Sequence, residues 1–215
     1  MPTNPVVFMK PTTSVAAHGA KVVKPRLTQK LDYEVELAVV IGKRCKDVKE
    51  EEALDFVLGY TVANDLSTRD WQIEPSLAGS QWCRSKAFDG FAPLGPVLTT
   101  RQAIPDPGSM RLRTFVNGEK RQDSCTSDLI FSVAQMVSFL SAGTTLEPGC
   151  VILTGTPEGV AMGFADPPWL QVGDRVVTEI EGIGTLEIEI VADPAADAQC
   201  YANTSQLKKR KERAE

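Results

Sequence analysis

The chain has 215 residues, 42% of them hydrophobic and 24% charged, with a formal net charge of −5. A chain of this length buries roughly 70% of its unfolded surface, so one compact domain is expected without a disulfide or metal staple. The acidic balance argues against a nucleic-acid surface, which needs a basic face. No apolar run in the sequence reaches the roughly 18 residues of a membrane span.

Cysteine usage and the N-terminal sequence indicate the compartment. The five cysteines are widely spaced and form no C-x-x-C pair, which is typical of reduced thiols rather than of a disulfide frame or a zinc site. The chain does not open with a charged region followed by an apolar core, as a secretory signal would. We therefore expect an intracellular protein, cytoplasmic or mitochondrial, that binds neither membrane nor nucleic acid.

The first forty residues predict extended structure. Residues 6–9 and 22–23 are short apolar pieces near prolines. Residues 33–41 predict a longer strand, and its unbroken apolar continuation indicates burial on both faces. His18, the single histidine, falls in a loop between the first two pieces. We expect it to be a surface or loop-packing residue.

Two glutamates stand at the entrance of the buried strand. Glu34 and Glu36 are two residues apart, and side chains at i and i+2 of a strand point to the same face. Two like charges beside a buried strand repel each other and resist desolvation, so they need a cation, a proton or a basic partner. A hard divalent cation is one such partner, which makes the pair a candidate metal clamp.

The same spacing recurs near the C-terminus, so spacing alone is weak evidence. Glu179 with Glu181, and Glu187 with Glu189, alternate with apolar residues on either side of a glycine-containing turn. That pattern predicts a hairpin with one solvated face. We expect these two pairs to be ordinary surface charges.

A third carboxylate follows the buried strand after a helix and another strand. Residues 47–58 predict the helix, with Asp47 as its cap and Glu50 three residues on. Residues 59–63 predict the strand, which ends close to Asp65. A chain that leaves through the helix and returns through the second strand can place Asp65 beside the two glutamates. The three carboxylates would then form an oxygen set of the kind that Mg²⁺ prefers.

The middle of the chain predicts a loop, a hairpin and a second helix. Glycines and prolines fix the backbone around two aromatic residues in residues 86–96. Residues 111–117 alternate as a strand and end in an Asn117-Gly118 turn signal. Residues 127–140 carry the apolar spacing of a helix.

A strand over residues 151–153 runs into a segment rich in glycine and threonine, residues 154–160. Free backbone N–H groups and hydroxyls in such a segment would suit a carboxylate. A tight structural turn explains the same composition, and both interpretations stay open at this level.

Together these segments closely resemble the fumarylacetoacetate hydrolase family over nearly the whole chain. The four motifs that carry the resemblance, in chain order, are residues 32–37, 64–72, 86–96 and 153–157. Within that family, residues 167–170 are more similar to the eukaryotic domain-containing-protein-2 branch than to the true fumarylacetoacetases.

The resemblance implies an α+β fold that is mainly β, a mixed β-roll or sandwich of the family's C-terminal domain type with a few short helices. It implies one such domain over residues 1–200, a charged tail over residues 201–215 and, usually, a homodimer. It also implies a site for Mg²⁺ or Mn²⁺, with Ca²⁺ as a further option. The residues that match the family's metal ligands are Glu34, Glu36 and Asp65.

The function implied is that of a metal-dependent hydrolase or lyase acting on small 2-oxo acids through a metal-bound enolate. The substrates would be acylpyruvates, fumarylpyruvate or oxaloacetate. Arg69 and Lys86 would be catalytic, and the residues that hold the substrate's oxygens would be Arg69, Gln72, Lys86 and Thr156. The residue types alone point the same way, because three anions bind a dication and two neighbouring cations suit an anionic substrate.

One motif of the family's carbon–carbon hydrolases has no match. Those enzymes resemble one another in an upstream Gly-x-Asn-Tyr-x-x-His-x-x-Glu segment whose histidine and glutamate activate water, and His18 does not fit it. Losing general acid–base catalysis costs about 10²–10⁴ in rate, so hydrolysis would suffer more than decarboxylation or keto–enol tautomerisation of oxaloacetate. Three alternatives therefore stay open: a tautomerase or decarboxylase, a catalytically silent metal-binding dimer that lost this lid, and an incomplete sequence.

Overall fold

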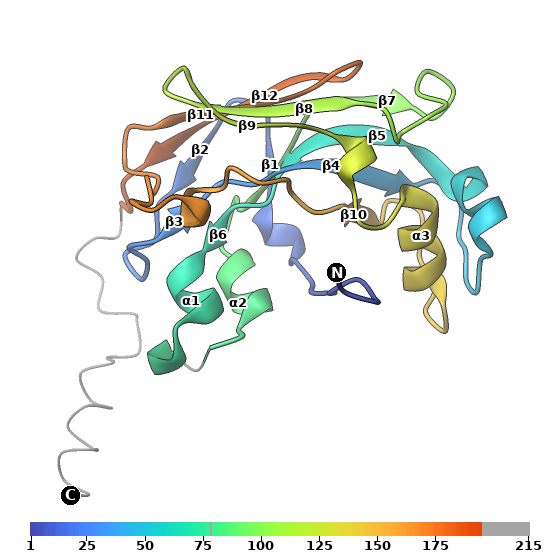
Figure 1. Ribbon diagram of the computed structural model, residues 1–215, viewed down its shortest axis with the longest axis horizontal. Coiled ribbons are helices and arrows are strands. Elements are labelled where there is room, and N and C mark those ends of the chain that lie inside the picture. The colour runs from blue at the N-terminus through green and yellow to red at the C-terminus, as the bar shows by residue number, and fades with distance from the viewer. Residues whose placement is uncertain (78, 195–215) are drawn as a thin grey trace, which may run out of the picture.

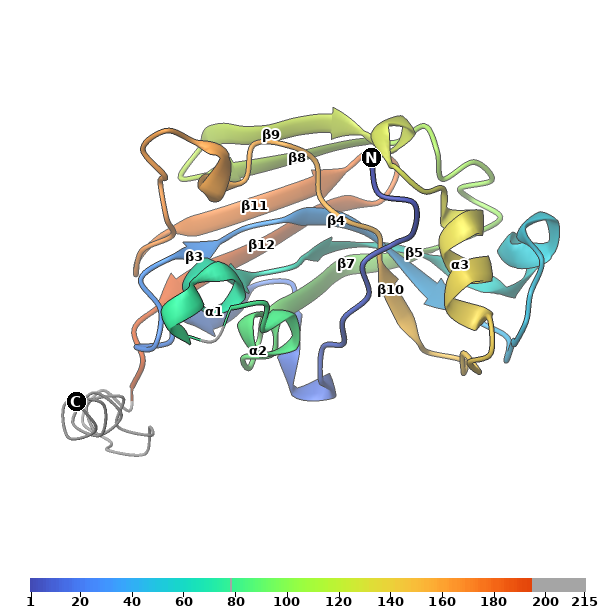
Figure 2. The same ribbon diagram turned by 60° about the horizontal axis from the view of Figure 1, so that its bottom comes forward.

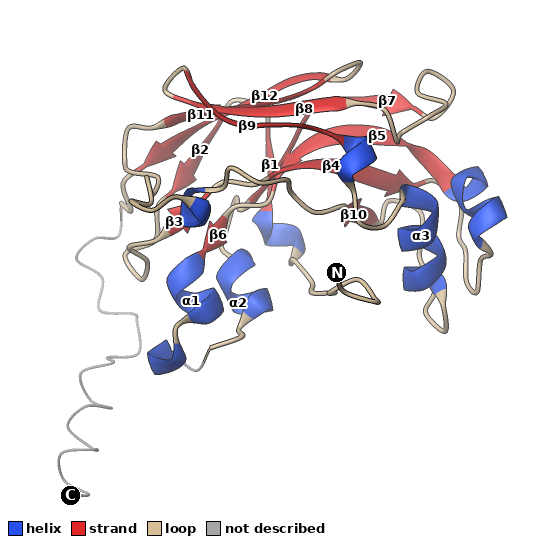
Figure 3. Cartoon of the chain, viewed as in Figure 1, coloured by secondary structure: helices blue, strands red, loops and turns tan. Residues whose placement is uncertain are grey.

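Two curved sheets stack face to face in the computed structural model, which describes residues 1–77 and 79–194 (Figure 1). Each of these sheets has five strands, and a third sheet has two. Helices gather beneath the stack, on the side away from the upper sheet (Figure 3). The predicted fold, α+β and mainly β, is therefore confirmed. The tail predicted for residues 201–215 falls outside the described residues.

The first sheet carries the acidic segment. β4 lies between β5 and β10, and six of its seven residues are buried, which confirms the expected burial on both faces. In the described sheet every pair is antiparallel except β1 with β7. In the order of the sheet, the strands are β1 (Val15–Ala17), β7 (Ala92–Thr100), β5 (Val57–Asn64), β4 (Val35–Ile41) and β10 (Val151–Leu153).

The second sheet is built from two hairpins and one further strand. β11 and β12 form the predicted C-terminal hairpin, and β8 and β9 are joined at Asn117 and Gly118, with φ of 52° and 84°. Positive φ at both central residues is what a type I′ turn requires. In the order of the sheet, the strands are β2 (Ala20–Val23), β12 (Gly184–Val191), β11 (Arg175–Ile180), β8 (Arg111–Val116) and β9 (Glu119–Cys125).

The acidic residues of the C-terminal hairpin face away from the core, as expected. Ile180 and its inward-facing neighbours are buried, whereas Glu181 and Glu189 are exposed. Glu179 forms an ion pair with Arg113 at 2.6 Å on the half-buried surface. These pairs are therefore surface charges and not part of a buried acidic site.

Apolar side chains fill the space between the two sheets. The larger cluster joins the odd-numbered residues of β4, such as Leu37, to Leu112 of β8 and Ile180 of β11. Burial of this kind contributes about 25 cal/mol per Å² of apolar surface, so it dominates the stability of the stack. Because successive side chains of a strand alternate, Glu36 projects from the opposite face of β4, away from this core.

Short helices cover that opposite face. β3 (Leu31–Asp32) pairs with β6 (Ser67–Thr68), and α1 (Arg69–Ile73) and α2 (Trp82–Lys86) follow β6 in the chain. Figure 2 shows α3 (Val133–Ser141) at the other end of the sheet. The 3-10 helices are η1 (Thr12–Ser14), η2 (Glu50–Phe56), η3 (Pro75–Leu77), η4 (Thr126–Asp128) and η5 (Ala161–Gly163). No helix within the described ranges is long and apolar enough to cross a membrane.

The helix predicted over residues 47–58 is wrong in type and in both ends. The structure has a 3-10 helix over residues 50–56. Asp47 has a φ of 53°, and its carboxylate accepts a hydrogen bond from the Gly143 N–H at 2.7 Å instead of capping the helix. Val57 already pairs with Ile41 in the ladder between β5 and β4. The helix therefore has to end before Val57, and the short space favours a tight 3-10 turn.

The helix predicted over residues 127–140 begins later than expected. α3 starts after Ser132, whose hydroxyl accepts a hydrogen bond from the Gln135 N–H in a capping box. Residues 126–128 form a separate 3-10 turn. Residues 6–9, predicted as an extended piece, join no described strand. In Figure 2 the N-terminal segment runs between α2 and α3.

Candidate active site

Three carboxylates predicted to share a metal converge in the structure. Glu36 lies in β4, Glu34 immediately precedes that strand, and Asp65 follows the last residue of β5. The two strands are antiparallel, and the Asp65 N–H donates to the Glu34 carbonyl oxygen at 2.8 Å. One oxygen from each carboxylate lies within 4.8 Å of the others. The side chains are buried, with relative exposures of 6% for Glu34, 3% for Glu36 and 0% for Asp65.

Three cations surround this triad of Glu34, Glu36 and Asp65. Lys86 Nζ donates to Glu34 Oε2 at 2.6 Å and to Asp65 Oδ2 at 2.5 Å. Arg69 Nη2 donates to Glu34 Oε1 at 2.5 Å. Lys10 Nζ donates to Asp65 Oδ1 at 2.6 Å and to the Lys86 carbonyl oxygen at 2.6 Å. Both oxygens of Glu34 and of Asp65 are therefore engaged by positive charge.

Glu36 is the least compensated member of the triad. Its Oε2 accepts a hydrogen bond from the Gly155 N–H at 2.6 Å, and among the described residues it forms no ion pair with a lysine or arginine. Burial, followed by repulsion from Asp65 and Glu34, raises the pKa of its carboxyl well above the ordinary value. A donor set made only of oxygens, with one carboxylate that has no cationic partner in the described residues, fits a hard divalent cation.

The pKa values of the two lysines, Lys86 and Lys10, are shifted in opposite directions. Burial lowers the pKa of Lys86, but the carboxylates of Glu34 and Asp65 outweigh burial, so the pKa is raised and the ammonium stays charged. For Lys10, burial outweighs the attraction of Asp65, and the pKa is lowered. Burial also raises the pKa of Glu34 in spite of Lys86 and Arg69. Lys86 therefore keeps its proton, and its full set of hydrogen-bond donors, to a higher pH than Lys10 does.

Arg69 is held in one orientation from three sides. Its Nε donates to Asp32 Oδ2 at 2.8 Å and its Nη1 donates to Gln72 Oε1 at 2.8 Å, while Nη2 reaches Glu34. Asp32 is fully buried, and it also accepts from the backbone N–H of Ala161 at 2.7 Å. Gln72 thus contacts Arg69 as part of the same network, one turn of α1 away.

Thr156 lies in the segment that follows β10, and in the described part of the chain it forms no hydrogen bond with the triad. Thr154 donates its hydroxyl to the buried Leu37 carbonyl oxygen at 2.9 Å, which gives it a structural role. Gly155 turns its N–H toward Glu36, so that backbone donor serves the triad. Thr156 Oγ1 accepts a hydrogen bond from Gln122 Nε2 at 2.8 Å. Of the two interpretations left open for residues 154–160, the structural one therefore holds for Thr154 and Gly155, which bind the strand that carries Glu36.

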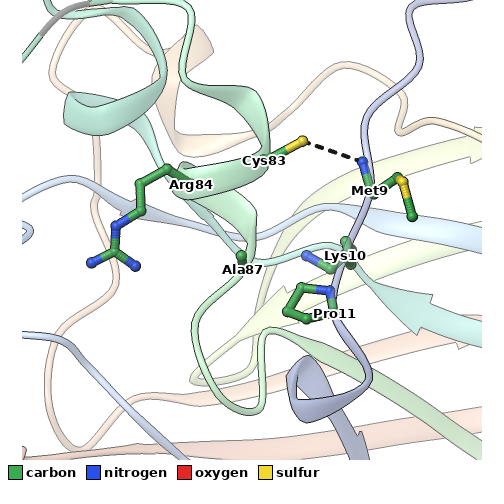
Figure 4. Close-up of a pocket in the computed structure, with 6 residues that line it drawn as sticks. All are labelled: Met9, Lys10, Pro11, Cys83, Arg84 and Ala87. Carbon is green, nitrogen blue, oxygen red and sulfur yellow. Dashed lines mark hydrogen bonds between the residues drawn. The ribbon is translucent and has the colours of Figure 1, made fainter.

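A shallow cavity of about 440 Å³ lies beside the site, between the N-terminal segment and α2. Figure 4 shows Cys83 with its sulfur turned toward the backbone nitrogen of Met9, which lies 3.5 Å away, and Arg84 pointing to the other side of α2. Lys10 lines this cavity and also binds Asp65. Its lining residues are Met9, Lys10, Pro11, Cys83, Arg84 and Ala87.

Two charged residues of the site, Asp32 and Lys10, were not predicted from the sequence. Asp32 stands two residues before Glu34, and that continued i, i+2 spacing of acids was a usable signal. Lys10 comes from a segment 55 residues away from Asp65, and no local pattern points to it. His18 is exposed in a turn, where Nδ1 accepts from the Glu187 N–H at 3.2 Å. The expectation of a surface histidine is therefore confirmed.

Comparison with known sequences identifies the family. The model of the family described as fumarylacetoacetate (FAA) hydrolase C-terminal matches residues 1–191. A protein from Burkholderia multivorans that is named as a hydrolase is 48% identical over 185 residues, which are 86% of this chain and 64% of that protein. The chain thus spans 64% of the length of this curated relative.

Solved structures agree with this result. A fumarylacetoacetate hydrolase from Exiguobacterium antarcticum superposes with a TM-score of 0.83 at 42% identity, over 87% of this chain and 66% of that one. A 5-carboxymethyl-2-hydroxymuconate delta-isomerase from Mycobacterium smegmatis gives 0.80 at 43% identity, over 89% and 71%. A maleylpyruvate hydrolase from a Sphingobium species gives 0.76 at 33% identity, over 86% and 64%. The chain belongs to the fumarylacetoacetate hydrolase family, in the region of its C-terminal domain.

Proposed function

We propose that this chain is the catalytic domain of a metal-dependent enzyme that acts on small 2-oxo acids. The observation that carries the proposal is the convergence of Glu34, Glu36 and Asp65, all buried, with the cationic groups of Arg69 and Lys86. Buried charges are costly unless they are paired, and clusters of buried ionisable groups with shifted pKa values are typical of catalytic sites.

The metal ligands we propose are Glu34, Glu36 and Asp65, with Mg²⁺ as the first candidate, Mn²⁺ as the second and Ca²⁺ as a further one. When bound there, the ion would supply a Lewis acid that stabilises negative charge on a substrate oxygen. The lack of an ion pair at Glu36 within the described residues supports this assignment. Burial, and then repulsion from Asp65 and Glu34, raises the pKa of its carboxyl, and a dication would offset both effects.

Arg69 and Lys86 would bind and orient the substrate. Three of the five N–H groups of the Arg69 guanidinium are engaged by Asp32, Gln72 and Glu34, which leaves two that can donate to a carboxylate. When a bond to the carbon next to the 2-oxo group breaks, the electron pair left on that carbon delocalises onto the oxo oxygen. The Lys86 ammonium can donate a hydrogen bond to that oxyanion, since its pKa is raised and it keeps its proton.

The reaction classes we propose are carbon–carbon hydrolysis, decarboxylation and keto–enol tautomerisation, on acylpyruvates, fumarylpyruvate or oxaloacetate. The names of the similar structures, an isomerase and two hydrolases, cover more than one of these classes. Gln72 and Thr156 would contact the substrate's remaining oxygens. A single catalytic domain over residues 1–200 and a homodimer complete the proposal. Placement in the eukaryotic branch rests on residues 167–170 alone, while the relatives described above are bacterial.

The test follows the absorbance of oxaloacetate and of acetylpyruvate with and without Mg²⁺. The wild type is expected to consume at least one of them with a rate that depends on the metal, and Glu34→Ala and Glu36→Gln are expected to lose that rate. Glu189→Gln, which removes one negative charge from the exposed hairpin face, is the matched control and should retain it. Equal rates in the wild type and Glu34→Ala would refute the proposal. Tight Mg²⁺-dependent oxalate binding without turnover of any 2-oxo acid would favour the catalytically silent protein.

A further inference from the structure

Gln122 joins three parts of the fold through a single side chain. It lies on β9 in the second sheet and is 1% exposed. Its Oε1 accepts from the Val35 N–H at 3.0 Å and from the Thr114 hydroxyl at 2.8 Å. Its Nε2 donates to Thr156 Oγ1 at 2.8 Å and to the Pro157 carbonyl oxygen at 3.0 Å. A primary amide offers two donors and two acceptor positions, so all four are used.

The contact with Val35 lies at the first residue of β4, between the two glutamates of the triad. β10 pairs with β4 only as far as Leu153 opposite Ala38, so the edge of β4 beyond that point has no strand neighbour in the described sheet. The Val35 N–H faces that edge, between Glu34 and Glu36. Buried N–H groups need an acceptor, and Gln122 Oε1 takes the place of the missing strand.

The contact with Thr156 decides where the Thr156 hydroxyl lies. A threonine hydroxyl accepts through its lone pairs and donates through one hydrogen. Because Thr156 Oγ1 accepts from Gln122, its own hydrogen is directed away from Gln122 and can be donated to a ligand. Gly155, the preceding residue, is bound to Glu36. The segment is therefore tied to β4 on one side and to Gln122 on the other.

We propose that Gln122 is a positioning residue, which holds the Thr156 hydroxyl at a fixed place relative to the carboxylate triad so that it donates to the carboxylate end of the 2-oxo acid. This inference rests on the proposed function, in which Thr156 contacts the substrate. Gln122 itself touches neither substrate nor metal. Without it, Thr156 is free to rotate about χ1 and loses its directed donor.

The experiment measures binding of oxalate, a dianion that resembles the enolate of a 2-oxo acid, by calorimetry in saturating Mg²⁺, and binding of Mg²⁺ alone. Gln122→Met keeps the side-chain length and removes all four hydrogen bonds. The control is Thr114→Val, because Thr114 bonds the same amide oxygen from β8 but contacts neither β4 nor the Thr156 segment through that hydroxyl. Gln122→Met is expected to weaken oxalate binding by about tenfold, the effect of losing one hydrogen bond to a charged group. Thr114→Val is expected to change it less than about twofold.

Thr156→Val separates positioning from a general structural effect. If Gln122 acts through Thr156, Gln122→Met changes oxalate affinity less than about twofold when Thr156→Val is already present, because coupled residues are not additive. An equal tenfold loss in both backgrounds, or wild-type affinity in Gln122→Met, overturns the positioning role and leaves the proposed function standing. Absence of Mg²⁺-dependent oxalate binding in the wild type overturns both. If Gln122→Met does not fold, Gln122→Glu replaces it in the same measurements. Glutamate keeps the acceptor for the Val35 N–H and loses the donor to Thr156.

Discussion

Replacing Glu36 by glutamine is expected to stabilise the metal-free protein. The Glu36 carboxylate is buried beside Glu34 and Asp65, and burial, followed by their repulsion, raises its pKa well above the ordinary value of 4.5. An ionised carboxyl that is buried without a cationic partner costs the folded state free energy until a proton neutralises it. Glutamine keeps the acceptor for Gly155 and removes the charge. We expect a gain of about 1–3 kcal/mol, or about 2–10 °C in the melting temperature of a domain of this size.

The stability difference between the wild type and Glu36→Gln should depend on pH and on Mg²⁺. A carboxyl whose folded pKa is raised binds its proton more tightly in the folded state than in the unfolded state. The penalty of wild-type Glu36 is therefore absent below about pH 4.5, grows as the pH rises toward the folded pKa, and is complete above it. Mg²⁺ at 100 times its dissociation constant should add about 2.7 kcal/mol to the wild type and much less to the variant, so Mg²⁺ should remove most or all of the variant's advantage in stability.

The assay is urea denaturation at several pH values, with and without Mg²⁺, and Glu189→Gln serves as the control. Glu189 is exposed, so its replacement should change the free energy of unfolding by less than about 0.5 kcal/mol. A less stable Glu36→Gln protein without metal at pH 8 would refute the reasoning. Equal stabilisation of the wild type and Glu36→Gln by Mg²⁺ would refute the assignment of Glu36 as a ligand.

Three further substitutions test other parts of the network. Asp32→Asn removes the buried negative partner of Arg69 and should lower the free energy of unfolding by about 3 kcal/mol in urea denaturation; a loss below about 1 kcal/mol would contradict the pairing. Lys10→Met removes an ammonium that competes for Asp65 and should tighten Mg²⁺ binding about tenfold by calorimetry, whereas weaker binding would speak against competition. Ser132→Ala removes the capping box of α3 and should cost about 1 kcal/mol without changing turnover, and a change in turnover would show that α3 influences the site.

Local patterns predicted the elements that hold the triad. The spacing of Glu34 and Glu36, the apolar run after them and the return of the chain to Asp65 are all visible in the sequence, and the structure brings the three together. Strand periodicity is a local property that follows from the alternation of side chains. The C-terminal hairpin and the Asn117-Gly118 turn were predictable for the same reason.

Tertiary structure decided the partners of those residues and the ends of the helices. Lys10 reaches Asp65 across 55 positions of the sequence, and Gln122 reaches Val35 across 87. The helix expected over residues 47–58 gave way to a short 3-10 helix because Val57 belongs to the ladder with β4. Sequence alone therefore determined that Glu34 and Glu36 lie on one face, since strand spacing sets that locally, whereas the pairing of β4 with β5 brings Asp65 to them. Only the packing of distant segments decided which cations and amides hold them, because contacts between distant segments depend on sheet register and stacking and leave no period in the chain.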